Sequence, residues 1–386
     1  MKILLIHTSY RLKGGEDSVV VAEKKLLEDN NHEVFLLSFK NSSNSFQALA
    51  SFLISIFNPF SYLKTIKAIK KIRPDVIHIH NWHFGASPAV FIAAYKKKIP
   101  IVHTLHNYRL LCPSGTLFHN KNIFLDSLHQ GFAWSAIKNR VYRDSFFQTL
   151  WLAVILWFHK KIGTWNKVDK YILLTPFSQN LFMNSSLKIS PDKFIAKPNF
   201  VEKNSTVSDL DRTDTFLFIG RLSEEKGILC LLNAFEKSHF KLKIGGEGPL
   251  TNTVKEACKK HPNILYLGIL DKKQVQEQMK ECTALIFPSI WNEPFGLVLI
   301  EAFLLKMPII ASNLGAIPFI LKDGYNGLLF EAGNFVDLQN KLTEWGNKSI
   351  EEKILFSKNA YQSYLENYTP DKNLDQLLSI YDSVLR

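Results

Sequence analysis

The residues best suited to chemistry in this chain are two glutamates, Glu293 and Glu301, which stand eight positions apart in Trp-Asn-Glu-Pro-Phe-Gly-Leu-Val-Leu-Ile-Glu. The residues between them are almost wholly apolar. Proline suits the first turn of a helix because it lacks an N–H and has a fixed φ, so Pro294 predicts a helix start. At about 1.5 Å of rise per residue, Glu301 would lie roughly 12 Å along the axis from Glu293. This is about the span from a sugar ring to the ribose of a nucleotide sugar.

The start of this helix is a candidate site for a diphosphate. Free N–H groups and the positive end of the helix dipole attract anions, and Phe295 and Gly296 stand there. Apolar residues cover nearly all sides of the helix, which predicts that it is buried. A carboxylate in a buried helix is costly unless something binds it. The alternative is a glutamate that merely reaches solvent.

A second motif, residues 220–227 (Gly-Arg-Leu-Ser-Glu-Glu-Lys-Gly), places two cations on a turn between a predicted strand and a predicted helix. Arg221 offers a planar fork of donors to phosphate oxygens, and Lys226 offers a mobile point charge. Two basic residues on a turn are often only a solvated surface. Beside the paired glutamates, they predict half of a pyrophosphate clamp.

Several motifs, in their order along the chain, resemble glycosyltransferase family 4, the retaining transferases of GT-B type. They are residues 1–7, 14–17, 32–34, 74–80, 104–108, 220–227, 245–249, 293–301 and 323–330. The resemblance covers nearly the whole chain. It implies an α/β fold with two Rossmann-like, doubly wound domains that face each other across a cleft. It also implies an enzyme of bacterial surface polysaccharide synthesis (capsule, O-antigen or exopolysaccharide).

The resemblance assigns roles to the second-half residues in a retaining transfer from a UDP- or GDP-sugar. Arg221 and Lys226 would stabilise the charge on the departing diphosphate. Glu301 would accept hydrogen bonds from the ribose hydroxyls. Glu293 would hold hydroxyls of the donor sugar close to the reacting carbon, as a catalytic residue. Covalent catalysis stays open beside front-face attack, which we prefer.

The first half contributes two glycines and a histidine at a predicted sheet edge. Gly14 and Gly15 follow the first strand, and without Cβ atoms their backbone can approach a ligand closely. An ordinary tight turn explains them equally well. His106 ends the fourth strand, where a lone histidine is usually structural. The resemblance instead makes His106 a catalytic-site residue that hydrogen-bonds the donor sugar or phosphate.

No metal and no other cofactor are expected. Three clustered histidines, His78, His80 and His103, fit alternating strand faces, and no carboxylate stands at a spacing that would complete a metal site. Asp209 and Asp211 have the Asp-x-Asp form that metal-dependent glycosyltransferases use, but they fall in a polar linker. The cations of residues 220–227 and the helix dipole already supply positive charge.

The chain of 386 residues exceeds one comfortable core, so two domains are expected. Strand-like runs alternate with amphipathic helical ones, which is typical of parallel α/β sheets. The expected strands are residues 3–7, 33–39, 75–80, 99–105, 170–175, 193–197, 215–219, 241–245, 264–268, 284–288, 308–312 and 327–330. We expect an acceptor-side domain over 1–203, a donor-binding domain over 204–364, and a C-terminal helix, 365–386, that returns to the first domain.

The composition limits the cellular compartment and the kinds of partner that we expect. Four dispersed cysteines without a Cys-x-x-Cys pair fit a reducing cytoplasm. No apolar run reaches the length of a membrane span, and the N-terminus does not resemble a signal peptide. The net charge of +12 favours an anionic partner. Without a nucleic-acid-binding motif, we expect no nucleic acid as partner, and a cytoplasmic protein, potentially at the inner face of the cell membrane.

Two segments suggest peripheral contact with an anionic membrane and with a glycan or polyprenyl-diphosphate-linked acceptor. Residues 60–73 place four lysines on one helical side and Leu63 among the apolar residues of the other. An ordinary domain helix is at least as good an interpretation. Residues 146–158 are too short to span a bilayer, and we expect a core helix with one exposed edge.

Other functions remain open at this point. A nucleotide-sugar epimerase or a phosphorylase of GT-B type would bind similar ligands, and a non-catalytic subunit could scaffold polysaccharide assembly. A nicotinamide oxidoreductase is disfavoured because residues 246–251 lack the third glycine of the dinucleotide fingerprint. The loop at residues 111–115 lacks the further cysteines of similar sequences, which leaves the acceptor undefined.

Overall fold

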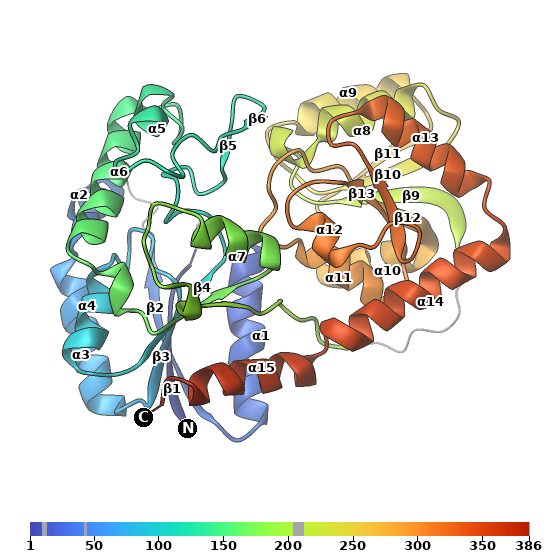
Figure 1. The fold of residues 1–386 in the computed structure, drawn as a ribbon. Coiled ribbons are helices and arrows are strands. Elements are labelled where there is room, and N and C mark those ends of the chain that lie inside the picture. Colours follow the sequence, from blue (N-terminus) through green and yellow to red (C-terminus); the bar gives the residue numbers. More distant parts are fainter. Residues whose placement is uncertain (10–13, 42–44, 204–211, 386) are drawn as a thin grey trace. The chain divides into compact units, whose positions relative to one another are not determined.

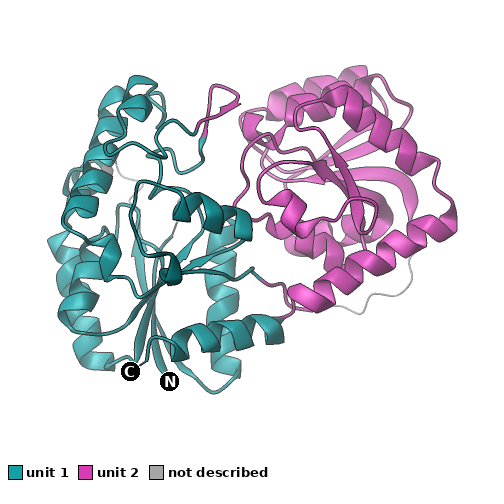
Figure 2. Cartoon of the chain, in the orientation of Figure 1, with its two compact units in different colours: residues 1–117, 125–199, 370–386 teal, residues 118–124, 200–369 magenta. Residues whose placement is uncertain are grey.

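The computed structural model describes residues 1–9, 14–41, 45–203 and 212–385. These residues form two compact units (Figure 2). Unit 1 comprises Met1–Leu117, Leu125–Asn199 and Pro370–Arg386, and unit 2 comprises Phe118–Phe124 and Phe200–Thr369. The chain therefore leaves unit 1 near Asn199 and returns to it at Pro370.

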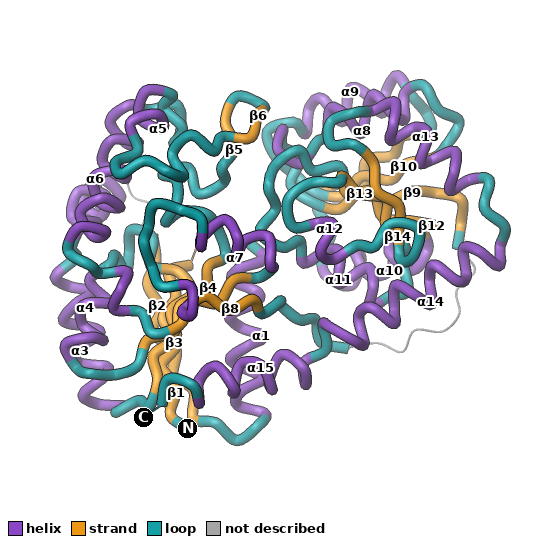
Figure 3. Tube along the Cα trace, in the orientation of Figure 1, coloured by secondary structure: helices purple, strands orange, loops and turns teal. Residues whose placement is uncertain are grey.

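Unit 1 is built on a six-stranded sheet with the order β2-β1-β3-β4-β7-β8 (Figures 1 and 3). All five strand pairings are parallel. The strands are β1 (Lys2–Ser9), β2 (Glu33–Lys40), β3 (Val76–Asn81), β4 (Ile101–Leu105), β7 (Lys170–Leu173) and β8 (Phe194–Ala196). Helices cover both faces, with α1 (Gly15–Asp29) and α15 (Pro370–Asp382) on one side and α3 (Pro59–Ile72) and α4 (Ala89–Lys96) on the other. The remaining helices are α2 (Ser45–Leu53), α5 (Trp134–Lys138), α6 (Phe146–Lys161) and α7 (Pro176–Met183).

Unit 2 repeats this plan with the strand order β11-β10-β9-β12-β13-β14, again parallel throughout. The strands are β9 (Thr213–Ile219), β10 (Lys241–Gly245), β11 (Ile264–Gly268), β12 (Cys282–Phe287), β13 (Ile309–Ser312) and β14 (Gly327–Phe330). The helices are η4 (Glu224–Lys226, one 3-10 turn), α8 (Ile228–Glu236), α9 (Thr251–Lys260), α10 (Lys272–Glu281), α11 (Leu297–Leu304), α12 (Ile317–Ile320), α13 (Phe335–Gly346) and α14 (Ile350–Asn367). A small hairpin, β5 (Phe118–His119) and β6 (Asn122–Ile123), is grouped with this unit.

All twelve expected strands are present, with ends that shift by one or two residues. Strands covered on both faces by helices must be apolar almost throughout. Every residue of β3 and β12 is accordingly buried. The predicted α/β fold with two Rossmann-like sheets is therefore confirmed.

The helix expected at Pro294 does not begin there. It starts only at Leu297, because Gly296 has a φ of 100° that no regular helix contains. Glu293 therefore stands in a loop, and Glu301 alone lies on the helix. The prediction of two carboxylates along one helical axis is wrong, since glycine's conformational freedom outweighs the preference of proline for a helix start.

Both segments considered for membrane contact have an exposed apolar side chain. Helix α3 buries Ser61, Thr65 and Ile69, whereas Leu63, one of the apolar residues opposite the lysines, is 62% exposed. The small polar residues are buried because their hydroxyls bond to nearby backbone carbonyls. Helix α6 does have one buried and one exposed side, and Phe147 on the exposed side is 79% accessible.

Within residues 1–9, 14–41, 45–203 and 212–385, no single helix is long and apolar enough to cross a bilayer. The helical segments Leu49–Ile56 and Pro59–Ile72 reach that length and composition only as a pair, and a bend of 71° separates them.

The turn that carries Lys226 depends on a glycine directly after it. Gly227 has a φ of +71°, and a Cβ placed on it would lie 1.8 Å from the carbonyl oxygen of Pro288. The backbone after β9 therefore touches the backbone after β12. This contact is what brings Lys226 beside the segment that contains Glu293.

We expect Gly227→Ala to destabilise unit 2 far more than Gly324→Ala. Gly324 has the same φ of +71° but no atom within 4 Å of its absent Cβ, so alanine there adds only left-handed strain of about 1 kcal/mol. At Gly227 a backbone displacement is added, which should cost at least about 2 kcal/mol more. Denaturant unfolding measures both variants, and equal losses would contradict the close approach.

Candidate active site

In unit 2, the predicted site residues Lys226 and Glu293 form an ion pair. Lys226 Nζ lies 2.6 Å from Glu293 Oε1. Lys226 ends η4, and Glu293 follows β12, so both lie beyond the carboxyl ends of neighbouring strands. Parallel α/β sheets bind their ligands at this edge. The Glu293 side chain is almost fully buried, while about a quarter of Lys226 remains accessible.

Glu293 is held by two further donors at the same oxygen. Ser289 Oγ donates to Oε1 at 2.7 Å and Trp291 Nε1 at 2.8 Å. The Lys226 ammonium in turn lies 5.4 Å from the centroid of the Trp291 ring and 5.6 Å from that of Phe287. Cation–π contacts and three converging donors fix the orientation of the buried carboxylate. Ser289 and Trp291 were not predicted, although both stand within four residues of Glu293.

Arg221, the second predicted cation, lies on the surface of the same turn. Its guanidinium is 66% exposed and donates from Nη2 to Glu225 Oε1 at 2.7 Å. Ser223 Oγ also donates to that oxygen. Both cations of the proposed clamp are thus paired with carboxylates here. An arriving phosphate would have to share or replace these contacts.

The other predicted donor-binding residues of unit 2 surround the start of α11. Gly296 is the residue before the helix, and no side chain caps its first N–H groups. The Phe295 ring is buried and lies edge-on to Tyr368 at 6.0 Å, which leaves only its backbone for a ligand. Glu301 is half-buried. Burial raises the pKa of Glu301, and the charge of Lys272 opposes that rise.

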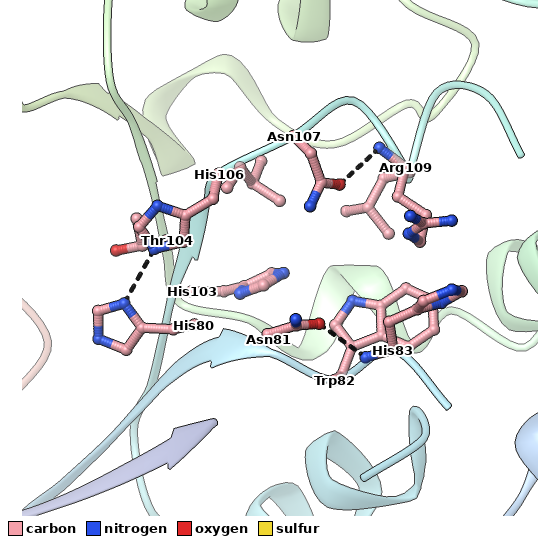
Figure 4. A pocket seen from close by; sticks show the side chains of 11 residues that line it. His80, Asn81, Trp82, His83, His103, Thr104, His106, Asn107 and Arg109 are labelled. Carbon is pink, nitrogen blue, oxygen red and sulfur yellow. Dashed lines mark hydrogen bonds between the residues drawn. The ribbon is translucent and has the colours of Figure 1, made fainter. Parts of the chain in front are cut away.

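In unit 1, His106 stands at the end of β4 and is one of eleven residues that line a pocket (Figure 4). Its Nε2 lies 3.0 Å from Nδ1 of His80, the hydrogen-bonded pair at the left of Figure 4. Burial holds the pKa of His106 well below its ordinary value, with His80 adding to the effect. His106 is therefore a neutral imidazole that either accepts or donates one hydrogen bond at its other nitrogen.

A buried carboxylate lies behind this histidine pair. Glu23 of α1 places Oε1 3.1 Å from both His78 Nδ1 and His80 Nε2. Burial alone would raise the pKa of Glu23, but His78 and His80 hold it well below the usual value. Lys197 Nζ, also buried, lies 3.7 Å from Glu23 Oε2.

Glu23 corrects an expectation from the sequence. We found no carboxylate spaced to join the histidines, yet Glu23, His78 and His80 together form a group whose ligand atoms could hold a metal ion. Glu23 was missed because it lies on a helix more than fifty residues earlier, and only tertiary packing brings it to β3. The ammonium of Lys197 already balances its charge, which disfavours a cation at the same point.

Gly14 and Gly15, which follow the first strand, are exposed, and the Asp17 side chain binds the backbone of Gly14. Gly14 N–H donates to Asp17 Oδ2 at 2.9 Å, and Asp17 Oδ1 lies 2.9 Å from His7 Nε2. Among the described residues, a Cβ on Gly14 would meet no atom within 4 Å. Gly15 begins α1. Residues 10–13 beside it lie outside the described residues.

Two family models match the chain in succession. The model described as Glycosyltransferase Family 4 matches residues 13–203, and the model described as Glycosyl transferases group 1 matches residues 201–363. Their shared boundary falls close to the division between the two units.

Curated relatives are similar over half or most of the chain. An uncharacterized glycosyltransferase of Methanocaldococcus jannaschii is 31% identical over 50% of this chain and 54% of its own length. The O-antigen chain mannosyltransferase C of Escherichia coli is 26% identical over 52% of this chain and 58% of its own length. The chain thus spans little more than half of these two relatives. An uncharacterized 41.2 kDa protein in the cps region of Klebsiella pneumoniae is 26% identical over 88% of both chains.

Solved structures share the fold over the whole chain. The HepE protein of Anabaena in complex with UDP has a TM-score of 0.70 at 18% identity, covering 99% of this chain and 100% of that one. The same protein in complex with UDP-glucose has a TM-score of 0.69 at 15% identity, covering 99% of this chain and 100% of that one. A glycosyltransferase of Rickettsia africae has a TM-score of 0.71 at 18% identity, covering 100% and 98%.

We expect the acid sensitivity of unit 1 to depend on its buried histidines. Burial lowers the pKa of His103 to about 3, although its hydrogen bond to the Ile79 carbonyl opposes this. Below pH 6.5 the unfolded chain takes up a proton that folded His103 refuses, so stability falls as the pH falls. His103→Asn keeps a donor for Ile79 but cannot be protonated.

The difference in free energy of unfolding between wild type and His103→Asn should therefore shrink as the pH falls from 6.5 to 4. The expected change is about 1.4 kcal/mol per pH unit. The free energies of unfolding of both proteins at several pH values measure this. A gap that stays constant over that range would show that His103 titrates normally in the folded protein.

Proposed function

The chain belongs to glycosyltransferase family 4, and we propose that it transfers a sugar from a UDP- or GDP-sugar, with retention at the anomeric carbon. The observation that carries the proposal is the Lys226–Glu293 pair, a buried carboxylate fixed by three donors beside an accessible ammonium. Such a pair can meet a diphosphate and a sugar hydroxyl side by side. The UDP and UDP-glucose complexes of a protein with the same fold support a nucleotide-sugar donor.

Lys226 and Arg221 are the proposed ligands of the donor diphosphate. As the sugar–phosphate bond breaks, negative charge grows on the leaving oxygen, and preplaced cations stabilise that charge. Lys226 would turn from Glu293 toward phosphate, and the uncapped N–H groups at the start of α11, after Phe295 and Gly296, would assist. The Lys226 side chain is partly exposed, which leaves room for this movement.

Glu293 and Glu301 are the proposed partners of the two sugars of the donor. Glu293 would accept hydrogen bonds from hydroxyls of the transferred sugar and stabilise its oxocarbenium-like transition state, because the contact with Lys226 holds its carboxyl group in place. Glu301, one helix turn farther into α11, would accept from the ribose hydroxyls. His106 and the turn at Gly14 and Gly15 are the proposed contributions of unit 1. We prefer front-face attack assisted by the leaving phosphate to a covalent intermediate.

A metal ion is not part of the proposed mechanism. The positive charge that a leaving diphosphate needs comes from Lys226, Arg221 and the α11 dipole. Asp209 and Asp211, the pair with the metal-binding spacing, lie outside the described residues. We therefore propose that transfer proceeds in the presence of chelators.

The proposed acceptor is a glycan or polyprenyl-diphosphate-linked glycan of bacterial surface polysaccharide. Similarity to an O-antigen chain mannosyltransferase and to a protein in a cps region supports this pathway. Aromatic side chains on the outer side of α6, Phe146 and Phe147 among them, offer a surface for peripheral contact with an anionic membrane. Four free cysteines fit the reducing cytoplasmic side of that membrane.

Glu293→Gln should lower kcat by about 100-fold or more with little change in donor KM, because its contact strengthens as charge develops in the transition state. Lys226→Ala should lower kcat and raise KM. Glu281→Gln is the matched control, since Glu281 at the end of α10 forms a surface ion pair of similar length, 2.7 Å, with Lys243 of β10. Steady-state kinetics compare the three, and full activity in Glu293→Gln would remove this residue from catalysis.

One donor among common UDP- and GDP-sugars should raise the melting temperature of the protein in buffer that contains EDTA. A ligand that binds only the folded state stabilises it by mass action, about 2.7 kcal/mol at 100 times Kd. The stabilising donor is then incubated with acceptor, and the anomeric configuration of the product is read by NMR. An inverted product, or binding that appears only after Mn²⁺ is added, would contradict the proposal.

A further inference from the structure

The pocket beside His106 contains an arrangement that the donor-site proposal does not use. It lies between the loop after β3 and the loop after β4, and its cavity volume is about 20 Å³, with the rest of the hollow open to solvent. The upper side of Figure 4 carries His106, Asn107 and Arg109, and the lower side carries His80, Asn81, Trp82 and His83. Both loops leave the carboxyl ends of adjacent parallel strands, where α/β sheets bind ligands.

Arg109 is a preorganised cation in this pocket. Its Nη1 donates to the Pro113 carbonyl at 3.1 Å, and its backbone N–H donates to Asn107 Oδ1 at 3.0 Å. Gly115 leaves room for the guanidinium, because a Cβ there would lie 3.0 Å from Arg109 Nη2. The Nε atom is buried and has no hydrogen-bond partner within the described chain. The position of the guanidinium is thus set by neutral groups.

No carboxylate lies within 4.0 Å of a charged nitrogen of Arg109 or of nearby Arg143, among the residues that the structure describes. Both guanidinium groups instead lie over the ring of Tyr142, at 5.9 and 5.3 Å from its centroid. Arg109 is half-buried and Arg143 is exposed. The positive charge in this pocket therefore lacks a partner from the described protein.

His83 supplies an unsatisfied imidazole at the same place. Its side chain is 5% exposed, and neither ring nitrogen has a hydrogen-bond partner within the described residues. The ring lies 3.7 Å from the centroid of Phe84 and edge-on to Tyr142. Burial holds the pKa of His83 well below its usual value, and Arg109 and Arg143 add to the shift. A neutral imidazole left without any partner costs about 1–3 kcal/mol per polar group.

We infer that Arg109 and His83 form a binding site for a phosphate group of the acceptor substrate. An anionic oxygen would balance the guanidinium and accept the N–H of the imidazole, which gives each group a partner. A neutral sugar would satisfy His83 but leave the charge of Arg109 without a counterion. The inference rests on the proposed function, because His106 of the donor-site proposal lines the same pocket.

The neighbouring surface indicates which phosphate compound fits. Arg143 is exposed, and after Asp144 and Ser145 come the exposed aromatics Phe146 and Phe147 at the start of α6. A polyprenyl diphosphate combines an anionic group with an apolar chain, so it matches a cationic pocket whose neighbouring segment bears exposed aromatics. The shared recognition chemistry is phosphate, and a soluble phosphate ester would use the same two side chains.

Isothermal titration with farnesyl diphosphate and with inorganic pyrophosphate tests the site. Arg109→Gln should weaken farnesyl diphosphate binding by about 10- to 100-fold, the usual effect of losing a charge-assisted hydrogen bond. Arg140→Gln is the matched control, since Arg140 is exposed, stands three residues before Arg143 and does not line the pocket. This substitution should change the affinity less than about twofold. His83→Gln provides a second variant if Arg109→Gln does not fold, and should also weaken binding.

The two probes separate the sources of phosphate. Tighter binding of farnesyl diphosphate than of pyrophosphate would identify a lipid-linked acceptor, and equal affinities would identify a soluble phosphate ester. The inference is overturned if Arg109→Gln binds both probes like wild type. It is also overturned if Lys226→Ala abolishes binding, because the anion then occupies the donor site. Conversely, farnesyl diphosphate bound at Arg109 by a protein that binds no nucleotide sugar would refute the proposed function and leave this site standing.

Discussion

A charge inside a folded protein must be balanced, and this requirement organises the functional parts of both units. In unit 2 the buried Glu293 carboxylate is balanced by Lys226, and in unit 1 Glu23 is balanced by Lys197. Each pair joins segments distant in sequence at the carboxyl edge or the flank of a parallel sheet. Arg109 departs from the pattern, because no carboxylate of the described residues pairs with it. Ligand binding is the natural way to complete such an arrangement.

The two pairs differ in a way that matters for function. Lys226 keeps about a quarter of its surface accessible, so the ion pair can open toward a ligand. Lys197 is buried and also donates to Asn373 Oδ1 of α15, which ties the returning C-terminal helix to the sheet of unit 1. Breaking a buried pair leaves an uncompensated charge. The first pair is therefore suited to catalysis and the second to holding the histidine cluster in place.

The histidine cluster links the sheet of unit 1 to its pocket. Glu23 lies beside His80, His80 bonds to His106, and His106 lines the pocket with Arg109. Burial lowers the pKa of His80 to about 4 and holds that of His106 well below its usual value, so both imidazoles are neutral at physiological pH. His106 is thus held at the pocket by His80, which Glu23 contacts in turn.

The sequence alone determined the elements and the residue types of the proposed donor site. Runs rich in apolar residues predicted all twelve strands, because a strand covered on both faces buries most of its side chains. Lys226 and Glu293 stand in recognisable motifs, and the structure brings them together in an ion pair. Tertiary structure decided what lies beside them: Gly296 moved the helix start past Glu293, and packing brought Glu23 to His80. Contacts between residues far apart in sequence depend on packing, which local periodicity does not encode.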